Sequence, residues 1–262
     1  MTDNHVHVGW YTNGYHSPIE VWLAEQEAGI DEIAVSSTST CAELYKLVIR
    51  EMRELIRLGG TRIHPLLWLT PRMMKTWGIR YMLHSKIRWE GVKMHWRAHR
   101  EWYYNRPLLA RALDVAKCLR VPVLLHTGDF KECHASVFLD ICRQHEDLTF
   151  VLAHGWPVVE TMEVLAQCGN VYVDTAFMPV VDAVSLVQKG FAGQMLFGTD
   201  APINQLFYKD MTTAEYIRGC LTTLQRELPP EIFAQILSNT LYVPRDSLYH
   251  SCVTRRLWWN VK

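Results

Sequence analysis

The feature that most constrains this chain is a series of eight short apolar segments, each followed by a longer stretch with helical periodicity. The segments begin roughly 22 to 30 residues apart, which fits the repeating unit of a (β/α)8 barrel better than an open doubly wound sheet. The predicted strands are Asp3–Val8, Glu32–Ser36, Arg62–Leu69, Gly91–His95, Val121–His126, Thr149–His154, Val171–Asp174 and Met195–Asp200. We therefore predict an α/β fold made of a single (β/α)8, or TIM, barrel.

Helix signals lie between these strands. The first helix is predicted to start at Ser17, which precedes Pro18 and stands three residues before Glu20, a pattern typical of a helix N-terminus. The side of this helix that faces the sheet is predicted to carry four apolar residues: Val21, Leu23, Ala24 and Ala28. Further helices are predicted at Cys41–Leu58, Pro107–Leu119, His134–His145, Val158–Cys168, Thr213–Leu228 and Pro230–Ser238.

Composition favours one large domain. The chain has 262 residues, of which 49% are hydrophobic and 21% charged, so it can bury a substantial core. Barrels of about 250 residues routinely form one unit, and no linker or low-complexity segment interrupts the chain. We predict one domain over residues 1–262. The aromatic tail Arg256–Trp259 is predicted either to seal the bottom of the barrel or to contact a second copy, which leaves a homodimer as an alternative.

The charge balance indicates a small-molecule substrate. Basic and acidic residues both number 27, so no overall field attracts nucleic acid or a membrane surface, and neither is an expected partner. We find no basic or apolar leader and no run of about 18 apolar residues, and we expect a cytoplasmic protein. The seven cysteines are scattered without a CxxC pair, so we expect reduced, mostly buried thiols.

Polar residues at the ends of the predicted strands are the candidates for chemistry, because the active site of a parallel barrel lies at the carboxyl ends of its strands. His5 and His7 are two residues apart on one strand and project to the same side. Apolar strands then end in His126 and His154, and the last one ends in Asp200. This set of nitrogen and oxygen donors suits a divalent ion, most readily zinc, with manganese or iron as alternatives.

The order of these motifs resembles that of the amidohydrolase superfamily, in particular its amidohydrolase-related branch. The resemblance rests on the HxH of the first strand, GVKMH on the fourth, histidines ending the fifth and sixth, GTDAP ending the eighth, and SNTLY after the barrel. It covers Asp3 to about Arg245. It implies that His5, His7, His126 and Asp200 bind the metal and that His154 polarises the substrate or transfers a proton. One departure is Trp96, which replaces a proline often found there.

This site predicts a metal-dependent hydrolase. A divalent ion makes a bound water acidic enough to attack a carbonyl carbon near neutral pH. Asp200 would accept the proton of that water and return it to the leaving group, while His154 would hold the carbonyl oxygen. The bond cleaved would belong to an amide, a lactone or another acyl compound. Two alternatives remain: a non-oxidative decarboxylase of an unsaturated or aromatic carboxylate, and a metal-storing or regulatory protein without turnover.

Lys93 and several arginines add detail to this prediction. Lys93 is expected to face the barrel interior as an unmodified, catalytic lysine beside one metal ion; the alternative is a carbamate that bridges two ions. Basic residues in the loops after the third and fourth strands suit a substrate that carries a carboxylate. These residues are Arg72, Lys75, Arg80, Arg97 and Arg100.

Overall fold

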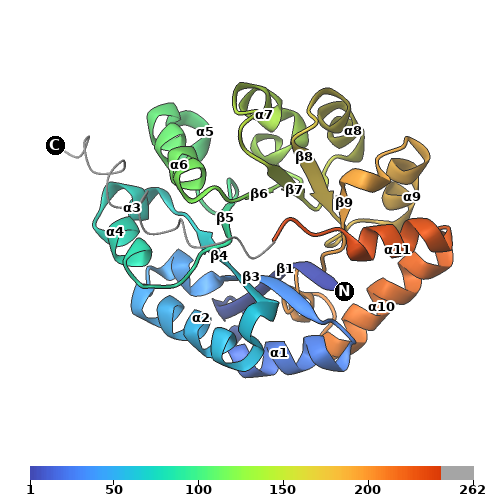
Figure 1. Ribbon diagram of the computed structural model, residues 1–262, viewed down its shortest axis with the longest axis horizontal. Helices are drawn as coiled ribbons and strands as arrows, with labels where there is room; N and C mark the ends of the chain where they lie inside the picture. The colour runs from blue at the N-terminus through green and yellow to red at the C-terminus, as the bar shows by residue number, and fades with distance from the viewer. Residues whose placement is uncertain (243–262) are drawn as a thin grey trace.

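The computed structural model describes residues 1–242, in which helices surround one curled sheet (Figure 1). The sheet has nine strands in the order β2-β1-β3-β4-β5-β6-β7-β8-β9, and every neighbouring pair is parallel except β1 with β2. The strands are β1 Thr2–Tyr11, β2 Gly14–His16, β3 Glu32–Ser37, β4 Ile63–Trp68, β5 Gly91–Met94, β6 Val123–His126, β7 Phe150–Ala153, β8 Val171–Asp174 and β9 Met195–Leu196. All eight predicted strands are present, and the β1–β2 hairpin is an addition that the sequence analysis did not predict.

Helices connect the parallel strands and lie on the outside of the sheet (Figure 1). They are α1 Pro18–Glu27, α2 Tyr45–Gly59, α3 Pro71–Lys75, α4 Gly78–Leu83, α5 Glu101–Tyr104, α6 Arg106–Leu119, α7 Leu139–Gln144, α8 Val158–Gln167, α9 Val180–Gln188, α10 Thr213–Glu227 and α11 Pro230–Ser238. Helix α9 and the short helices α3, α4 and α5 were not predicted. The segments expected as helices at Cys41–Leu58 and His134–His145 each begin with a 3-10 turn, Thr38–Ala42 (η1) and Ala135–Phe138 (η4).

The two ends of the sheet meet where β1 lies beside the segment that follows β9. Asn4 donates its N–H to the carbonyl of Phe197 at 2.9 Å, and His7 donates to that of Ala201 at 2.7 Å. The regular part of β9 nevertheless ends at Leu196, short of the predicted end at Asp200. Asp200 has a φ of 62°, a left-handed conformation that ends a regular strand. A complete (β/α)8 barrel therefore remains a prediction.

Helix α1 shows one confirmed and one wrong prediction. Ser17 caps the helix, and its hydroxyl accepts the N–H of Glu20 at 3.2 Å, as the sequence predicts. The predicted inner face is wrong at Leu23, which is 60% exposed, whereas Glu25 is fully buried. The buried side follows the spacing of three and four residues through Val21 and Glu25, and Leu23 lies off that line.

The core has two parts. A large apolar cluster fills the space between the sheet and the helices. A small cluster fills the inner side of the curled sheet and consists of Ala34, Leu66, Leu124, Val151, Ala153, Leu196 and Tyr242. Asn239, from the SNTLY segment, donates from Nδ2 to the carbonyl of Met195 at 2.8 Å. This contact fixes the start of β9, the strand that leads to Asp200.

Three further predictions concern the cysteines, the aromatic tail and membrane-spanning helices. The six cysteines in the described residues are free thiols; Cys133, Cys142 and Cys168 are buried, and Cys41 is exposed. The tail Arg256–Trp259 lies outside the described residues, as does Cys252. Within residues 1–242, every helix is too short or too polar to cross a membrane.

Candidate metal centre

The residues predicted to carry the chemistry gather at the carboxyl ends of the parallel strands. They come from five strands: His5 and His7 from β1, Lys93 from β5, His126 from the end of β6, His154 from the residue after β7, and Asp200 from the segment after β9. Parallel strands place their carboxyl ends at the same edge of a sheet, so residues far apart in the chain meet there. They form two groups that differ in charge.

The first group surrounds Asp200. Its Oδ1 lies 3.1 Å from Nε2 of His5 and 2.9 Å from Nε2 of His7. Nζ of Lys93 lies 2.5 Å and 2.9 Å from the same two nitrogens. Asp174 accepts a hydrogen bond from the other ring nitrogen of His5. We call these five residues, which are nearly or fully buried, the charged half of the site.

The contacts of Nδ1 bear on which ring nitrogen of His5 and of His7 carries a proton. Nδ1 of His5 lies 2.9 Å from Oδ2 of Asp174, which accepts hydrogen bonds, so Nδ1 carries a proton and His5, when neutral, has its lone pair on Nε2. Nδ1 of His7 lies 3.3 Å from the carbonyl and 3.0 Å from the hydroxyl of Ser36, and because a hydroxyl can donate or accept, these contacts are compatible with either tautomer of His7. Two imidazoles and a carboxylate so close together in a buried site need a positive charge among them. The Lys93 ammonium or a metal ion can supply it.

The donor atoms of His5, His7 and Asp200 lie close enough together to hold one ion, within 4.8 Å of one another. A second such group joins His5 and Asp174 to His154. Imidazole nitrogens combined with a carboxylate oxygen suit zinc and other first-row divalent ions. Metal-binding histidines typically donate their second N–H to a carboxylate or a carbonyl, as His5 does here to Asp174.

The second group, which we call the neutral half of the site, consists of His95, His126 and His154. Nδ1 of His154 donates to the carbonyl of Ala176 at 2.9 Å, and Nε2 of His154 lies 3.1 Å from Nδ1 of His126. The ring of His95 stacks on that of His126, with centroids 3.6 Å apart. Nε2 of His126 is buried without a hydrogen-bond partner.

The hydrogen bonds of the neutral half point to His126 as a donor. Because Nδ1 of neutral His154 already carries its proton, Nε2 of His154 accepts the N–H of His126. The lone pair of His126 is therefore on Nε2, the buried atom without a partner. The structure thus brings His126 and His154 together, while the ligand atoms of His5, His7 and Asp200 form their own cluster. The rings of His5 and His154, with centroids 5.2 Å apart, connect the two halves.

Burial and charge act differently on the two halves. Burial alone would raise the pKa of Asp200, but the charges and hydrogen bonds of His5 and His7 lower it well below its usual range. Burial lowers the pKa of Lys93 to about 8, against the attraction of Asp200 and Asp174. In the neutral half, burial lowers the pKa of His95, His126 and His154, so these rings are uncharged at neutral pH.

Backbone conformation is unusual at two of the candidate residues. His154 has a φ of 70° and Asp200 a φ of 62°, a region that residues other than glycine seldom adopt. The carboxylate of Asp174 accepts the N–H of His154 at 2.9 Å, and the carbonyl of His5 accepts that of Asp200 at 2.8 Å. Such conformations are retained where the surroundings enforce them, often at functional sites.

Sequence reasoning missed two buried carboxylates that support the site. Asp174 ends β8 and accepts hydrogen bonds from His5 and His154, so the rule that selected strand-end residues should have selected it too. Asp3 accepts the N–H groups of His5 and Thr199 at 3.0 and 3.2 Å, which ties β1 to the segment before Asp200. Asp3 lies at the start of its strand, where no strand-end signal applies.

The basic residues predicted near the substrate occupy different environments. Arg72 is exposed and paired with Glu43 at 2.9 Å, and Lys75 is paired with Glu101. The guanidinium groups of Arg97 and Arg100 lie over the ring of Phe130, at 4.8 and 5.8 Å from its centroid. Trp96 and Trp102, which flank these arginines, are buried in the core.

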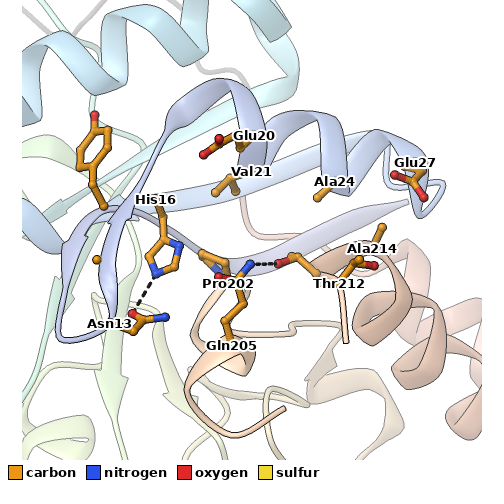
Figure 2. A pocket seen from close by; sticks show the side chains of 13 residues that line it. Asn13, His16, Glu20, Val21, Ala24, Glu27, Pro202, Gln205, Thr212 and Ala214 are labelled. Carbon is orange, nitrogen blue, oxygen red and sulfur yellow. Dashed lines mark hydrogen bonds between the residues drawn. The ribbon is translucent and has the colours of Figure 1, made fainter. Parts of the chain in front are cut away.

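A groove of about 420 Å³ lies on the outside of the hairpin and of the loop after Asp200. Figure 2 shows α1 on one side of it, with His16 and Asn13 at one end and Gln205, Thr212 and Ala214 opposite. None of the candidate residues lines this groove. Pro202 and Gln205 do, so its wall is continuous with the segment that carries Asp200.

Several known structures have a fold similar to that of this chain. One similar structure is a probable 2-pyrone-4,6-dicarboxylic acid hydrolase from Acinetobacter baumannii with citric acid bound (14% identity, TM-score 0.65, covering 90% of this chain and 96% of that one). A lactonase from Listeria monocytogenes has 10% identity and a TM-score of 0.59, with 90% and 91% covered. A 5-carboxyvanillate decarboxylase from Novosphingobium aromaticivorans, complexed with manganese and a nitrobenzoic acid, has 10% identity and a TM-score of 0.59, with 83% and 77% covered.

At these identities the likeness concerns the fold. A search of curated protein sequences gave no significant match. The family model described as amidohydrolase (Amidohydro_2), in contrast, matches residues 79–240. This match spans more than half of the chain and includes the strands that carry Lys93, His126, His154 and Asp200. The chain therefore belongs to the amidohydrolase family that this model defines.

Proposed function

We propose that this protein is a metal-dependent hydrolase that cleaves an amide, lactone or other acyl bond of a small carboxylate-bearing substrate. One observation carries the proposal: Nε2 of His5, Nε2 of His7 and Oδ1 of Asp200 converge, and the second ring nitrogen of His5 donates to a carboxylate, as is typical of a metal-binding histidine. A purely structural role would not explain why two imidazoles converge on a carboxylate in a buried site.

His126 completes the proposed ligand set. Its place in the set rests on the family resemblance, because its buried Nε2 has no hydrogen-bond partner but lies outside the cluster formed by the ligand atoms of His5, His7 and Asp200. Three imidazoles and one carboxylate favour zinc, with manganese or iron as alternatives. The manganese reported for the decarboxylase from N. aromaticivorans keeps that alternative open.

A bound divalent ion would make a coordinated water acidic and polarise the substrate carbonyl. Asp200 is ionised at neutral pH and would accept a proton from the attacking water, then return it to the leaving group. His154 has no N–H left for a substrate oxygen, because its one proton is bonded to Ala176. Of the two roles that the resemblance implies for His154, proton transfer therefore fits better than polarisation. Lys93, as an ammonium, would balance the negative charges of Asp200 and Asp174.

A decarboxylase is the second candidate, because one of the similar structures is an enzyme of that class. The same ion and the same cationic Lys93 would then stabilise the negative charge left after carbon dioxide departs. The two candidates differ in their products, since only a decarboxylase releases carbon dioxide. We also propose that the sheet closes into the complete (β/α)8 barrel, along the contact between β1 and residues 197–201.

The experiment is a screen of the metal-loaded protein against lactones, amides and aromatic carboxylates. We expect turnover of an acyl compound without release of carbon dioxide, and loss of that turnover after chelation. Turnover that is unchanged in the chelated protein contradicts a metal-dependent mechanism. Release of carbon dioxide from a carboxylate, without acyl cleavage, selects the decarboxylase.

A further inference from the structure

We propose that His95 and Trp68 bind the acyl oxygen of the substrate, each through the N–H of its ring, and so stabilise the negative charge that develops on that oxygen. The proposal rests on the proposed function for the reaction. It gives two residues outside the metal ligands the polarising role for which His154 has no N–H left.

The ring of His95 carries its proton on Nε2. His95 follows β5, and its Nδ1 accepts the backbone N–H of Ala98 at 3.2 Å. A ring nitrogen that accepts a hydrogen bond carries no proton, so neutral His95 has an N–H at Nε2 and no lone pair there. Within residues 1–242, the structure shows no acceptor for this N–H. His95 therefore offers a hydrogen-bond donor to a molecule bound in the site.

Trp68, the last residue of β4, offers a second donor. The residue is buried, and its Nε1 has no hydrogen-bond partner in the described part of the chain. An indole nitrogen can donate a hydrogen bond but cannot accept one. Buried donors are nearly always paired, because an unpaired one destabilises the fold. An oxygen acceptor on a bound molecule would satisfy this N–H.

Ring contacts place Trp68 and His95 where the charged and neutral halves of the site meet. The ring centroid of Trp68 lies 5.5 Å from that of His7 and 5.0 Å from Nζ of Lys93. The ring of His95 is nearly parallel to that of Trp68, at an angle of 8° and a centroid distance of 5.5 Å. His95 also stacks on His126, with centroids 3.6 Å apart. These two ring contacts fix the plane of His95 beside the proposed metal ligands.

Acyl cleavage creates an acceptor that needs such donors. A water molecule that adds to the acyl carbon gives a proton to Asp200, and the electron pair of the C=O bond moves onto the acyl oxygen. The pair returns when the leaving group departs with that proton. Fixed N–H donors stabilise the charged oxygen more than the neutral carbonyl, and this difference lowers the barrier. The ammonium of Lys93, beside Trp68, adds a positive charge to the same region.

The tautomer of His95 is tested without any ligand, by nitrogen NMR of protein that contains isotope-labelled histidine, with and without added zinc. We expect a proton on Nε2 of His95 and none on Nδ1. The signals are assigned by their absence from His95→Gln. A proton on Nδ1 would overturn the proposal, because Nε2 would then present a lone pair to the substrate oxygen.

The contact is tested with phenylphosphonate, whose tetrahedral anionic group resembles an acyl group under attack, and its Kd is measured by calorimetry on the metal-loaded protein. His95→Phe keeps a flat ring but removes the N–H. We expect this variant to weaken binding about tenfold or more at unchanged metal content, because a hydrogen bond to a charged oxygen is lost. His95→Gln, whose amide keeps a donor, should weaken binding less. Trp68→Phe, which removes the second N–H, should also weaken it.

A second probe and two control variants sharpen this test. Benzoate carries a planar carboxylate, and loss of benzoate binding in His95→Phe without loss of phenylphosphonate binding would show that the assignment to the acyl oxygen is wrong. His145→Phe, after α7, and Trp77→Phe, an exposed position before α4, are the matched controls and should bind both probes like the wild type.

Three further results would contradict the contact. They are an unchanged Kd for phenylphosphonate in both His95→Phe and Trp68→Phe, equal losses in the control variants, and no binding of phenylphosphonate by the wild type. None of these results depends on turnover, so failure of the proposed reaction is seen separately in the substrate screen.

Discussion

The charged and neutral halves of the metal centre compensate their buried polar atoms in different ways. In the charged half, carboxylates, imidazoles and an ammonium lie within about one hydrogen-bond length of each other, so opposite charges balance. In the neutral half, burial keeps three imidazoles uncharged, and hydrogen bonds fix their tautomers. The comparison indicates that the charged half supplies most of the attraction for a cation, while the neutral half supplies one lone pair and a proton acceptor.

The largest expected effect is that of removing the carboxylate at the centre of the charged half. Asp200→Ala should lose the metal ion and nearly all turnover. This loss should exceed the factor of about 10 to 100 that is typical when a hydrogen-bond partner of a metal ligand is removed. Metal analysis and kinetics measure both, with His126→Ala and His5→Ala as the companion ligand variants. Retained metal with near-normal turnover in Asp200→Ala would remove Asp200 from the ligand set and reverse the comparison.

A smaller loss is expected when the partner of a ligand is changed. Asp174→Asn should weaken metal affinity by about 10- to 100-fold, since His5 loses a charged acceptor but keeps its Nε2. Asp182→Asn, a change of the same kind on helix α9, is the control. Equal affinities in Asp174→Asn and the wild type would mean that the charge of Asp174 does not orient His5.

In the neutral half, His154→Asn should lower turnover more than metal content. The proton acceptor is lost, for which a cost of about 100-fold or more is typical, whereas His126 still offers Nε2. Titration of zinc into the chelated variant measures the ion, and initial rates measure the turnover. If metal content falls as far as in His126→Ala, then His154 is itself a ligand and the two halves bind two ions.

The smallest expected effect is on the free energy of unfolding, and it concerns Glu25 of helix α1. Glu25 is fully buried, neither of its carboxylate oxygens has a partner, and burial, together with Asp3, raises its pKa well above 4.5. Because the pKa of Glu25 is higher in the folded than in the unfolded protein, the free energy of unfolding is greatest below the unfolded-state pKa. It then falls as the pH rises toward the folded-state pKa. Glu25→Gln should therefore stabilise the protein increasingly between about pH 5 and pH 7, by about 1 kcal/mol per pH unit.

Denaturant unfolding of both proteins at several pH values measures this difference. A constant difference across the range would show that Glu25 does not titrate in the folded protein, and that a partner satisfies its carboxylate.

The order of strands and helices could be predicted from the sequence because apolar periodicity is a local signal. The eight predicted strands and the cap at Ser17 were found in this way. The hairpin strand β2, helix α9 and the short helices α3, α4 and α5 were missed because none gave a clear periodic signal against its neighbours. The buried Glu25 could not be predicted, since helical geometry sets its position whereas its polarity suggested exposure.

In the candidate site, sequence reasoning could predict which residues reach the edge of the sheet but not how they pair. His5, His7, Lys93 and Asp200 come together as the strand-end rule suggests. That His126 contacts His154 depends on ring orientation, which the sequence does not encode locally. The strand-end rule could have selected Asp174, whereas Asp3 supports the site through hydrogen bonds that only the register of the sheet reveals.

The central claim is that one ion binds at the charged half, beside an unmodified Lys93, and native mass spectrometry of the metal-loaded protein tests it most directly. The account predicts one divalent ion per chain and no added mass of about 44 Da, that of carbon dioxide on a lysine. It also predicts that the ion is absent from Asp200→Ala. Two ions per chain together with the added mass would contradict the account, because Lys93 would then be a bridging carbamate and the neutral half would hold the second ion.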